Sequence, residues 1–185
     1  SWQMISGGSN SGLYKSVNSG ETWSNLSDGL PEKIGKSGIS VSRANSNIVY
    51  ANIEAQGEKG GVYRSDNAGK KWIQVNKDRI TIARSWYYME IFADPINENI
   101  VYVMNAPALK SIDKGKTFKN MNTPHGDNHH LWVNPNNNEI MINSNDGGAN
   151  VSLNGGRSWS TQQNQPTAQF YRVIADNQVP YHVYG

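Results

Sequence analysis

The sequence predicts an all-β fold built from repeated units, and three observations support this prediction. One short motif occurs four times along the chain. Apolar runs suited to strands, such as residues 49–53 and 101–104, recur at corresponding distances from it. Glycine, asparagine and serine are abundant between these runs, as short strands joined by tight turns require. No pattern with a helical period extends over a useful length.

The repeated motif has the pattern Ser-x-Asp/Asn-x-Gly-x-x-Trp/Phe and predicts a β-hairpin. Its copies occupy residues 16–23, 65–72, 111–118 and 152–159. The Asp or Asn side chain can fold back onto the local backbone, glycine supplies a positive-φ turn position, and the aromatic residue anchors the returning strand in a core. In the second copy we interpret Asp66 as an acidic position shifted by one residue.

The spacing of the copies predicts the architecture. They begin 41 to 49 residues apart, and one four-stranded blade of a β-propeller takes about 40 to 50 residues. Each unit contains strand a, a turn, strand b, a loop, strand c, the motif hairpin and strand d. We therefore expect one β-propeller segment of four-stranded antiparallel blades over residues 1–185. Its parts are a partial blade at 1–30, blades at 37–76, 85–122 and 127–163, and a half blade at 168–185; residues 86–92 are expected to form a strand.

Both ends of the sequence fall at the same phase of the repeat, within strand b. Either the chain is a fragment of a larger propeller, or its last two strands complete the blade begun by the first two and close a four-bladed ring. We favour the fragment, with the remaining blades of the same propeller as partners, because most propellers have more than four blades.

Composition excludes several classes of protein. The formal net charge is +2 and no run of Lys or Arg occurs, which argues against nucleic acid as a partner. The absence of cysteine excludes disulfides and thiolate sites. No apolar stretch approaches the length that spans a membrane, and no residue pattern calls for a cofactor.

The four motifs resemble the Asp-box, also called the BNR repeat, of sialidases, xyloglucan-cleaving endoglucanases and the sortilin luminal domain. Residues 97–102 and 61–65 further resemble large bacterial proteins identified as glycosyl hydrolases with BNR or sortilin-like repeats. The resemblance implies a secreted or periplasmic, carbohydrate-active propeller, similar to a glycoside hydrolase, that acts on or binds a polysaccharide. The alternative is a non-catalytic, sortilin-like propeller that binds a protein or peptide. Whether hydrolysis occurs, and whether it would invert or retain the anomeric centre, stays open.

Candidate binding residues lie in loops at the end of the propeller opposite the hairpins, where loops vary and converge on the central channel. Aromatic residues there, with Tyr88 and Trp132 among them, are expected to stack on sugar rings. Aligning the strands a places Gly38, Glu90, His130 and Arg172 at one equivalent position near the channel mouth. The candidate substrate-binding residues are Arg84, Trp86, Tyr87, Glu90, His125, His129, His130, Phe170, Tyr171 and Arg172.

Two aspartates are candidate catalytic residues. Asp146, followed by Gly147 and Gly148, resembles the catalytic Asp-Gly-Gly segment of xyloglucan-cleaving propellers, and Asp127 is its expected partner, with Glu54 and Glu90 as other possibilities. A type I′ turn without catalytic function is the alternative for Asp146. Sialidase chemistry is disfavoured, since Arg84 and Arg172 make an incomplete arginine set.

The segment 125–130 also allows a second kind of site. In an extended chain residues two apart share a face, so His125, Asp127 and His129 could converge and bind zinc or another transition metal. Hydrogen bonding to the loop backbone is the other interpretation of the same three residues.

Overall fold

The computed structural model describes residues 7–8, 10–163 and 172–185, and this part of the chain is all-β, as the sequence predicts. Two short 3₁₀ helices, η1 (Gly57–Lys59) and η2 (Arg79–Ile82), accompany the strands. No helix in the described ranges is long and apolar enough to cross a membrane. The strands are β1 Leu13–Lys15, β2 Ser24–Leu26, β3 Ser37–Val41, β4 Val49–Ile53, β5 Gly61–Ser65, β6 Ile73–Asn76, β7 Glu90–Ala93, β8 Val101–Met104, β9 Ala108–Ser111, β10 Lys119–Asn120, β11 Asn128–Val133, β12 Met141–Asn145, β13 Gly148–Ser152, β14 Ile174–Ala175 and β15 Val183–Tyr184.

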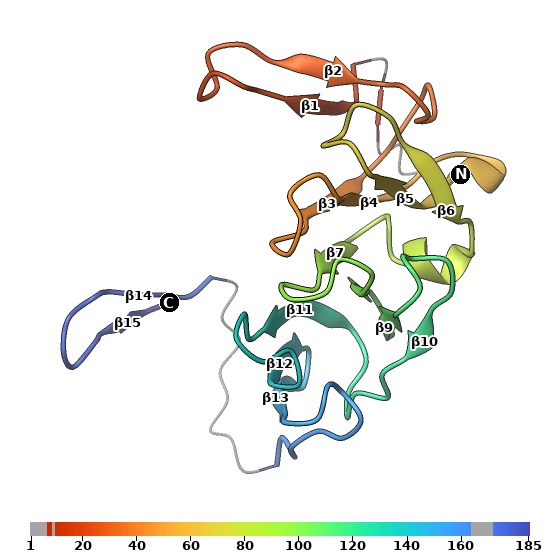
Figure 1. The fold of residues 1–185 in the computed structure, drawn as a ribbon. Helices are drawn as coiled ribbons and strands as arrows, with labels where there is room; N and C mark the ends of the chain where they lie inside the picture. The colour runs from red at the N-terminus through yellow and green to blue at the C-terminus, as the bar shows by residue number, and fades with distance from the viewer. Residues whose placement is uncertain (1–6, 9, 164–171) are drawn as a thin grey trace.

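The strands form antiparallel sheets whose members are neighbours in sequence. Two sheets have four strands, in the orders β3-β4-β5-β6 and β7-β8-β9-β10. Sheet β11-β12-β13 has three strands, and β1-β2 and β14-β15 have two each. Figure 1 shows the sheets from β1-β2 to β11-β13 following one another in chain order, each beside the next. Because every strand pairs locally, a sheet can bury its two faces only against the sheets beside it.

Three details differ from the sequence prediction. The blade expected at residues 127–163 has three strands and, among the described residues, no fourth. Residues 86–89 do not begin a strand, because the backbone amides of Tyr87 and Tyr88 both donate to the carbonyl of Arg84 at 2.8 Å and fold this segment into a turn. Strand β7 therefore begins only at Glu90. The strands β14 and β15 pair with each other and not with β1 or β2, and Figure 1 shows the two pairs far apart, so the described chain does not form a closed ring.

Strand register confirms that Gly38, Glu90 and His130 occupy equivalent positions. Gly38 pairs with Asn52, Glu90 with Met104 and His130 with Ser144. Each of these partners lies three residues after the strand-b residue that pairs with the serine of the hairpin motif. The repeat is thus the same in the three sheets, and three different side chains occur at this position of the first strand.

The four motif hairpins share one hydrogen-bonding arrangement. The serine hydroxyl donates to the Asn or Asp side chain two residues later and accepts from the amide of the motif glycine, which has φ between 82° and 92°. The same Asn or Asp oxygen accepts from the backbone amide four residues after it, at 2.8 to 3.0 Å. The side chains therefore satisfy backbone donors that a tight turn leaves unpaired.

In the second copy, Asn67 and not Asp66 has this role. Asn67 Oδ1 accepts from the Ser65 hydroxyl and from the Lys71 amide, like Asn18, Asp113 and Asn154 in the other copies. Asp66 instead pairs with Arg64 at 2.6 Å. The interpretation of Asp66 as a shifted motif acid is wrong, because the fold selects the residue two after the serine whether it is charged or not.

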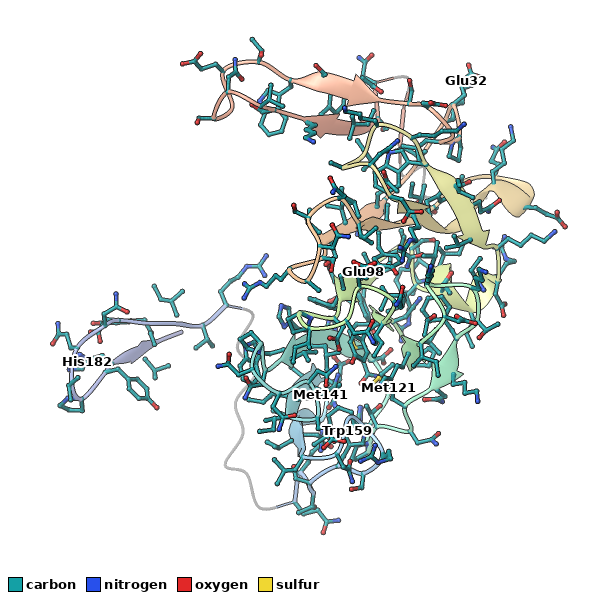
Figure 2. All side chains as sticks on the ribbon, in the orientation of Figure 1. Glu32, Glu98, Met121, Met141, Trp159 and His182 are labelled. Atoms are coloured by element: carbon teal, nitrogen blue, oxygen red, sulfur yellow. The ribbon has the colours of Figure 1, made fainter. Side chains whose placement is uncertain are left out.

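In the second, third and fourth hairpins the final aromatic residue packs against the preceding sheet, whereas Trp23 of the first hairpin is 62% exposed. Trp72 is 2% exposed and lies with Leu13 of β1 in one core cluster, and its backbone amide donates to Asp28. Phe118 packs against the cluster around Tyr50 and Val62, and the Trp159 indole donates to the Met121 carbonyl at 3.1 Å. Met121, Met141 and Trp159 lie together in Figure 2. These contacts lock consecutive sheets together.

Acid should open the third hairpin selectively. Desolvation raises the pKa of Asp113, but the hydrogen bonds from Thr117, Ser111 and Lys116 together outweigh it, and the pKa of this carboxyl falls from 3.8 to about 2. A depressed folded-state pKa contributes stability that is present above pH 3.8 and lost as the pH falls through about 2. The protection of residues 111–118, measured as exchange relative to the intrinsic rate at each pH, should therefore decrease toward pH 2, whereas that of residues 65–72, which use Asn67, should not. The substitution Asp113→Asn should abolish the difference, and a difference that persists would contradict this account.

Candidate functional site

The loops at the end opposite the hairpins bring most of the predicted site residues together. Three segments contribute, namely residues 83–88 before β7, residues 125–129 before and at the start of β11, and the turn between β12 and β13 at Asp146 and Gly147. These segments follow strands of different sheets, so the site depends on how the sheets pack.

Asn105 holds the turn at residues 83–88 from the protein interior. It directly follows β8 and is completely buried. Its side-chain oxygen accepts from the Arg84 amide at 3.0 Å, and its side-chain nitrogen donates to the Thr81 carbonyl at 2.9 Å. The helix η2 just before the turn is capped by Asp78, whose carboxylate accepts from the Ile80 amide. The turn therefore has a fixed conformation although it lies at the surface.

The neighbouring sheet holds the same turn from the side. Glu54 accepts a hydrogen bond from the Ser85 hydroxyl at 3.1 Å, and the Lys36 ammonium group donates to the Tyr87 carbonyl. Trp86 and Tyr87 stack with their ring centroids 5.8 Å apart and remain 50% and 45% exposed. A rigid turn thus presents two aromatic rings to solvent, which we name the aromatic platform.

Asp127 is partly buried next to the turn that carries this platform, and it forms an ion pair with Arg84. It also accepts from the Tyr88 hydroxyl at 3.3 Å, and its own amide donates to Ala106 at 2.9 Å. Its φ of 53° is in the left-handed region, which a short polar side chain tolerates better than most. The guanidinium of Arg84 also lies 5.4 Å from the Trp86 ring, a cation–π distance.

His129 joins this group to Asp146. Its imidazole stacks on the Tyr88 ring with centroids 4.1 Å apart and an interplanar angle of 25°. His129 Nε2 lies 2.8 Å from Asp146 Oδ1, and the Asp146 carboxyl side chain is 56% exposed. The Asp146 amide also donates to the Asp127 carbonyl at 3.3 Å. Both candidate catalytic aspartates therefore belong to one continuous group of contacts, with Asp127 covered and Asp146 open to solvent.

Asp146 and Gly147 form the tight turn between paired residues Asn145 and Gly148. Neither residue of the turn has a positive φ, so the turn is not of type I′, which requires positive φ at both positions. The buried Asn145 side chain accepts from the Gly147 amide at 3.0 Å and from Gln162 at 2.6 Å. A side-chain carbon at position 147 would meet His125 and Gln162 within 3 Å, so close packing requires glycine here.

Among the other predicted residues, His125 lies against Gly147 of the site, whereas Glu90 and His130 lie elsewhere, on neighbouring first strands. His130 meets Phe92 edge to face at 4.8 Å. Burial raises the pKa of Glu90, while His130 and Lys36 act in the opposite direction. His125 Nδ1 contacts the Gly126 carbonyl at 2.8 Å. Arg172 is exposed, and Phe170 and Tyr171 lie outside the described residues.

The described residues do not form the alternative metal site. No group of three or more His, Asp or Glu side chains among them is arranged to hold a metal ion. Instead Asp127 pairs with Arg84, and His129 pairs with Asp146. These contacts correspond to the hydrogen-bonding interpretation of this segment.

Sequence reasoning missed the residues that support the site. Asn105 and Lys36 belong to no motif; Asn105 holds the loop that leads into its own sheet, and Lys36 acts on that loop from the preceding unit. Tyr88 was expected only as an aromatic lining residue, but it is 9% exposed and links three charged or polar side chains. Burial raises the pKa of Tyr88, and the Asp127 carboxylate adds to this effect, so the hydroxyl remains a hydrogen-bond donor. Asn105 directly follows β8, and Asn145 ends β12 at the corresponding position of the next unit. This recurrence was a sequence signal that could have identified the supporting asparagine.

Solved structures with the same arrangement of sheets decide the fold. A GH74 enzyme from Niastella koreensis matches 88% of this chain with a TM-score of 0.65 and 16% identity. The GH74 xyloglucanase from Xanthomonas campestris matches 89% with a TM-score of 0.60 and 16% identity. Both are propellers. The described part of this chain has the fold of β-propeller blades. The chain spans 28% of the length of each of these two proteins.

A third propeller structure, YCF48 bound to a D1 peptide, matches 76% of this chain and 44% of its own length, with a TM-score of 0.50 and 14% identity. No family model and no curated protein matches the sequence. At these identities the likeness establishes the fold of the blades and not their activity.

Removing the Asn105 side chain should loosen the turn that carries the aromatic platform. Asn105→Ala removes the partner of the Arg84 amide and of the Ile80 carbonyl, while the Thr81 carbonyl keeps its bond from Asn52, and the change should cost about 1–3 kcal/mol in the free energy of unfolding. Hydrogen exchange of residues 81–88 should accelerate more than that of β8. The exposed Asn120→Ala is the matched control and should have little effect. Unchanged exchange in residues 81–88 would contradict the role given to Asn105.

Proposed function

We propose that this propeller segment binds a polysaccharide at the aromatic platform of Trp86 and Tyr87, beside the Asp146 carboxylate. The observation that carries the proposal is the exposure of two stacked rings on a turn that is held on two sides by buried or paired polar groups. Sugar rings present apolar faces to aromatic rings and hydroxyl groups to carboxylates. The likeness of the fold to GH74 enzymes supports this class of ligand.

A rigid platform is favourable for such a ligand. Asn105, Glu54 and Lys36 fix the turn before any ligand arrives, so binding has little further conformational entropy to remove. Asp146 lies on a separate loop and is oriented by His129. We expect its carboxylate to accept hydrogen bonds from sugar hydroxyls at the edge of the platform.

We further propose different roles for the two aspartates in a hydrolase of this kind. Asp146 is the candidate catalytic carboxylate because it is half-exposed and lies next to the platform. Asp127 positions other groups, since its carboxylate already serves Arg84 and Tyr88. Glycoside hydrolysis uses two carboxyl groups, so the second has to come from Glu54, Glu90 or another blade.

The proposal also covers the identity of the four hairpins and the cellular location of the protein. We propose that the four hairpins are Asp-box repeats, three of which use asparagine in place of aspartate, and that the protein is secreted or periplasmic, as GH74-like enzymes are expected to be. A sortilin-like protein that binds a peptide through the same surface is the alternative. The solved structure of YCF48 with a bound D1 peptide supports this alternative, because a propeller of similar fold binds a peptide in that structure.

Loss of a platform ring should weaken polysaccharide binding. Trp86→Ala or Tyr87→Ala should each reduce affinity roughly 2- to 12-fold for soluble polysaccharides such as xyloglucan and hydroxyethyl cellulose, measured by affinity electrophoresis. The exposed Trp23, on the first hairpin, provides the control Trp23→Ala. Equal loss in the control, or no retardation of the native protein by any polysaccharide, would contradict the proposed binding surface.

Hydrolysis should depend on Asp146. If reducing ends are released from xyloglucan, Asp146→Asn should lower the rate about 100-fold or more, since acid–base groups contribute about 10²- to 10⁴-fold. Asp66→Asn, which changes an exposed carboxylate in a hairpin, should leave it unchanged. Hydrolysis at the native rate in the Asp146 variant would exclude this residue as catalytic.

A further inference from the structure

Tyr88 contacts four side chains of the site and is not part of the exposed platform. It is 9% exposed, so a polysaccharide resting on Trp86 and Tyr87 has little access to it. Its hydroxyl donates to Asp127, and the Arg84 guanidinium lies 5.9 Å from its ring. Its other contacts are the stacked His129 imidazole and the edge of Tyr87 at 5.2 Å.

The position of Asp146 depends on a succession of contacts, each of which orients the next side chain. Asp146 is on a surface turn, and within the described residues the partner of its carboxylate is His129. The imidazole of His129 can rotate about its side-chain bonds, and the flat face of Tyr88 restricts this rotation. The Tyr88 ring in turn is held by its burial and by the edge contact with Tyr87, and its hydroxyl adds a hydrogen bond to Asp127.

We infer that Tyr88 is a positioning residue: its ring fixes the orientation of the His129 imidazole, and His129 in turn orients the Asp146 carboxylate toward the ligand. The inference rests on the proposed function, because it assigns Tyr88 a part in the same site. Tyr88 acts through the ring, and its hydroxyl mainly keeps Asp127 and Arg84 in place. Removing the ring and removing the hydroxyl should therefore have different effects.

The first arm of the test needs no ligand. The chain contains four histidines, and ¹⁵N-labelled side chains report which ring nitrogen of each carries the proton. In the native protein His129 should have its proton on Nε2, which faces Asp146. Tyr88→Leu should mix the two tautomers, whereas Tyr88→Phe, which keeps the ring, should not. An unchanged tautomer in Tyr88→Leu, or equal effects of the two variants, would overturn the inference.

The second arm measures the affinity for the polysaccharide. With xyloglucan as the probe, Tyr88→Leu should weaken binding roughly 2- to 12-fold and Tyr88→Phe less than about twofold. Combined with Asp146→Asn, Tyr88→Leu should add almost nothing, because both changes remove the same interaction. Fully additive losses would contradict a role through Asp146.

Controls separate this result from general destabilisation and from failure of the proposed function. Tyr63 is buried, and its hydroxyl donates to Lys59 at 2.6 Å, so Tyr63→Phe reports the effect of losing an equivalent hydroxyl elsewhere. Thermal unfolding identifies a variant that does not fold, and Tyr88→Phe then still tests the prediction for the hydroxyl. If the native protein binds no polysaccharide, the proposed function fails, while the tautomer arm still supports or overturns the positioning by Tyr88.

Discussion

The packing of the hairpin aromatic residues Trp72, Phe118 and Trp159 against the preceding sheet is the constraint on which the rest of this structure depends. A single sheet of short strands cannot bury both faces, and the buried Trp72 and the partly buried Trp159 supply the contact between sheets. The serine and asparagine side chains of the hairpin bring the aromatic residue to this position. Lysines just before the serine add a second link, since Lys15 donates to Ala68 and Lys110 donates to Gly155 in the hairpin of the next unit.

The site follows from this packing. The hairpins occupy one end of the row of sheets, which leaves the loops before the first strands and between the second and third strands to meet at the other end. There Lys36 and Glu54 of one sheet hold the turn that precedes β7, and Asp127 at the start of the next sheet pairs with Arg84 of that turn. Three units thus build one surface. A change in the packing of the sheets would move the aromatic platform relative to Asp146.

The sequence was sufficient for the fold because the motif repeats. Its spacing gave the period of the units, and the equivalence of Gly38, Glu90 and His130 followed from alignment alone. The interpretation went wrong where one residue is chosen over its neighbour. Asp66 carries the charge, but Asn67 lies two residues after Ser65, as the motif pattern requires, and Asn67 makes the hydrogen bonds to Ser65 and Lys71. The turn at residues 86–89 was predicted as a strand from its position in the repeat unit, but tertiary contacts with Asn105 and Lys36 fold it into a turn.

The candidate site was predictable as a region but not as a set of contacts. Arg84 and Asp127 are 43 residues apart, and no spacing rule indicates that they pair. The same pair explains why His125, Asp127 and His129 do not form a metal site among the described residues: Asp127 serves Arg84, and His129 turns to Asp146. Asp146 was found from the two glycines that follow it, and the structure adds that its turn lacks the backbone conformation of a type I′ turn.

The most direct test of the central claim, that a polysaccharide binds at the loop end of the propeller on the aromatic platform, uses the six tryptophans of the chain as reporters. Their indole N–H signals can be followed by NMR while xyloglucan oligosaccharides are added. The account predicts that the Trp86 signal shifts and saturates, while those of the buried Trp72 and of Trp23 on the first hairpin stay in place. A saturating shift at Trp23 or Trp132 with Trp86 unchanged would contradict it.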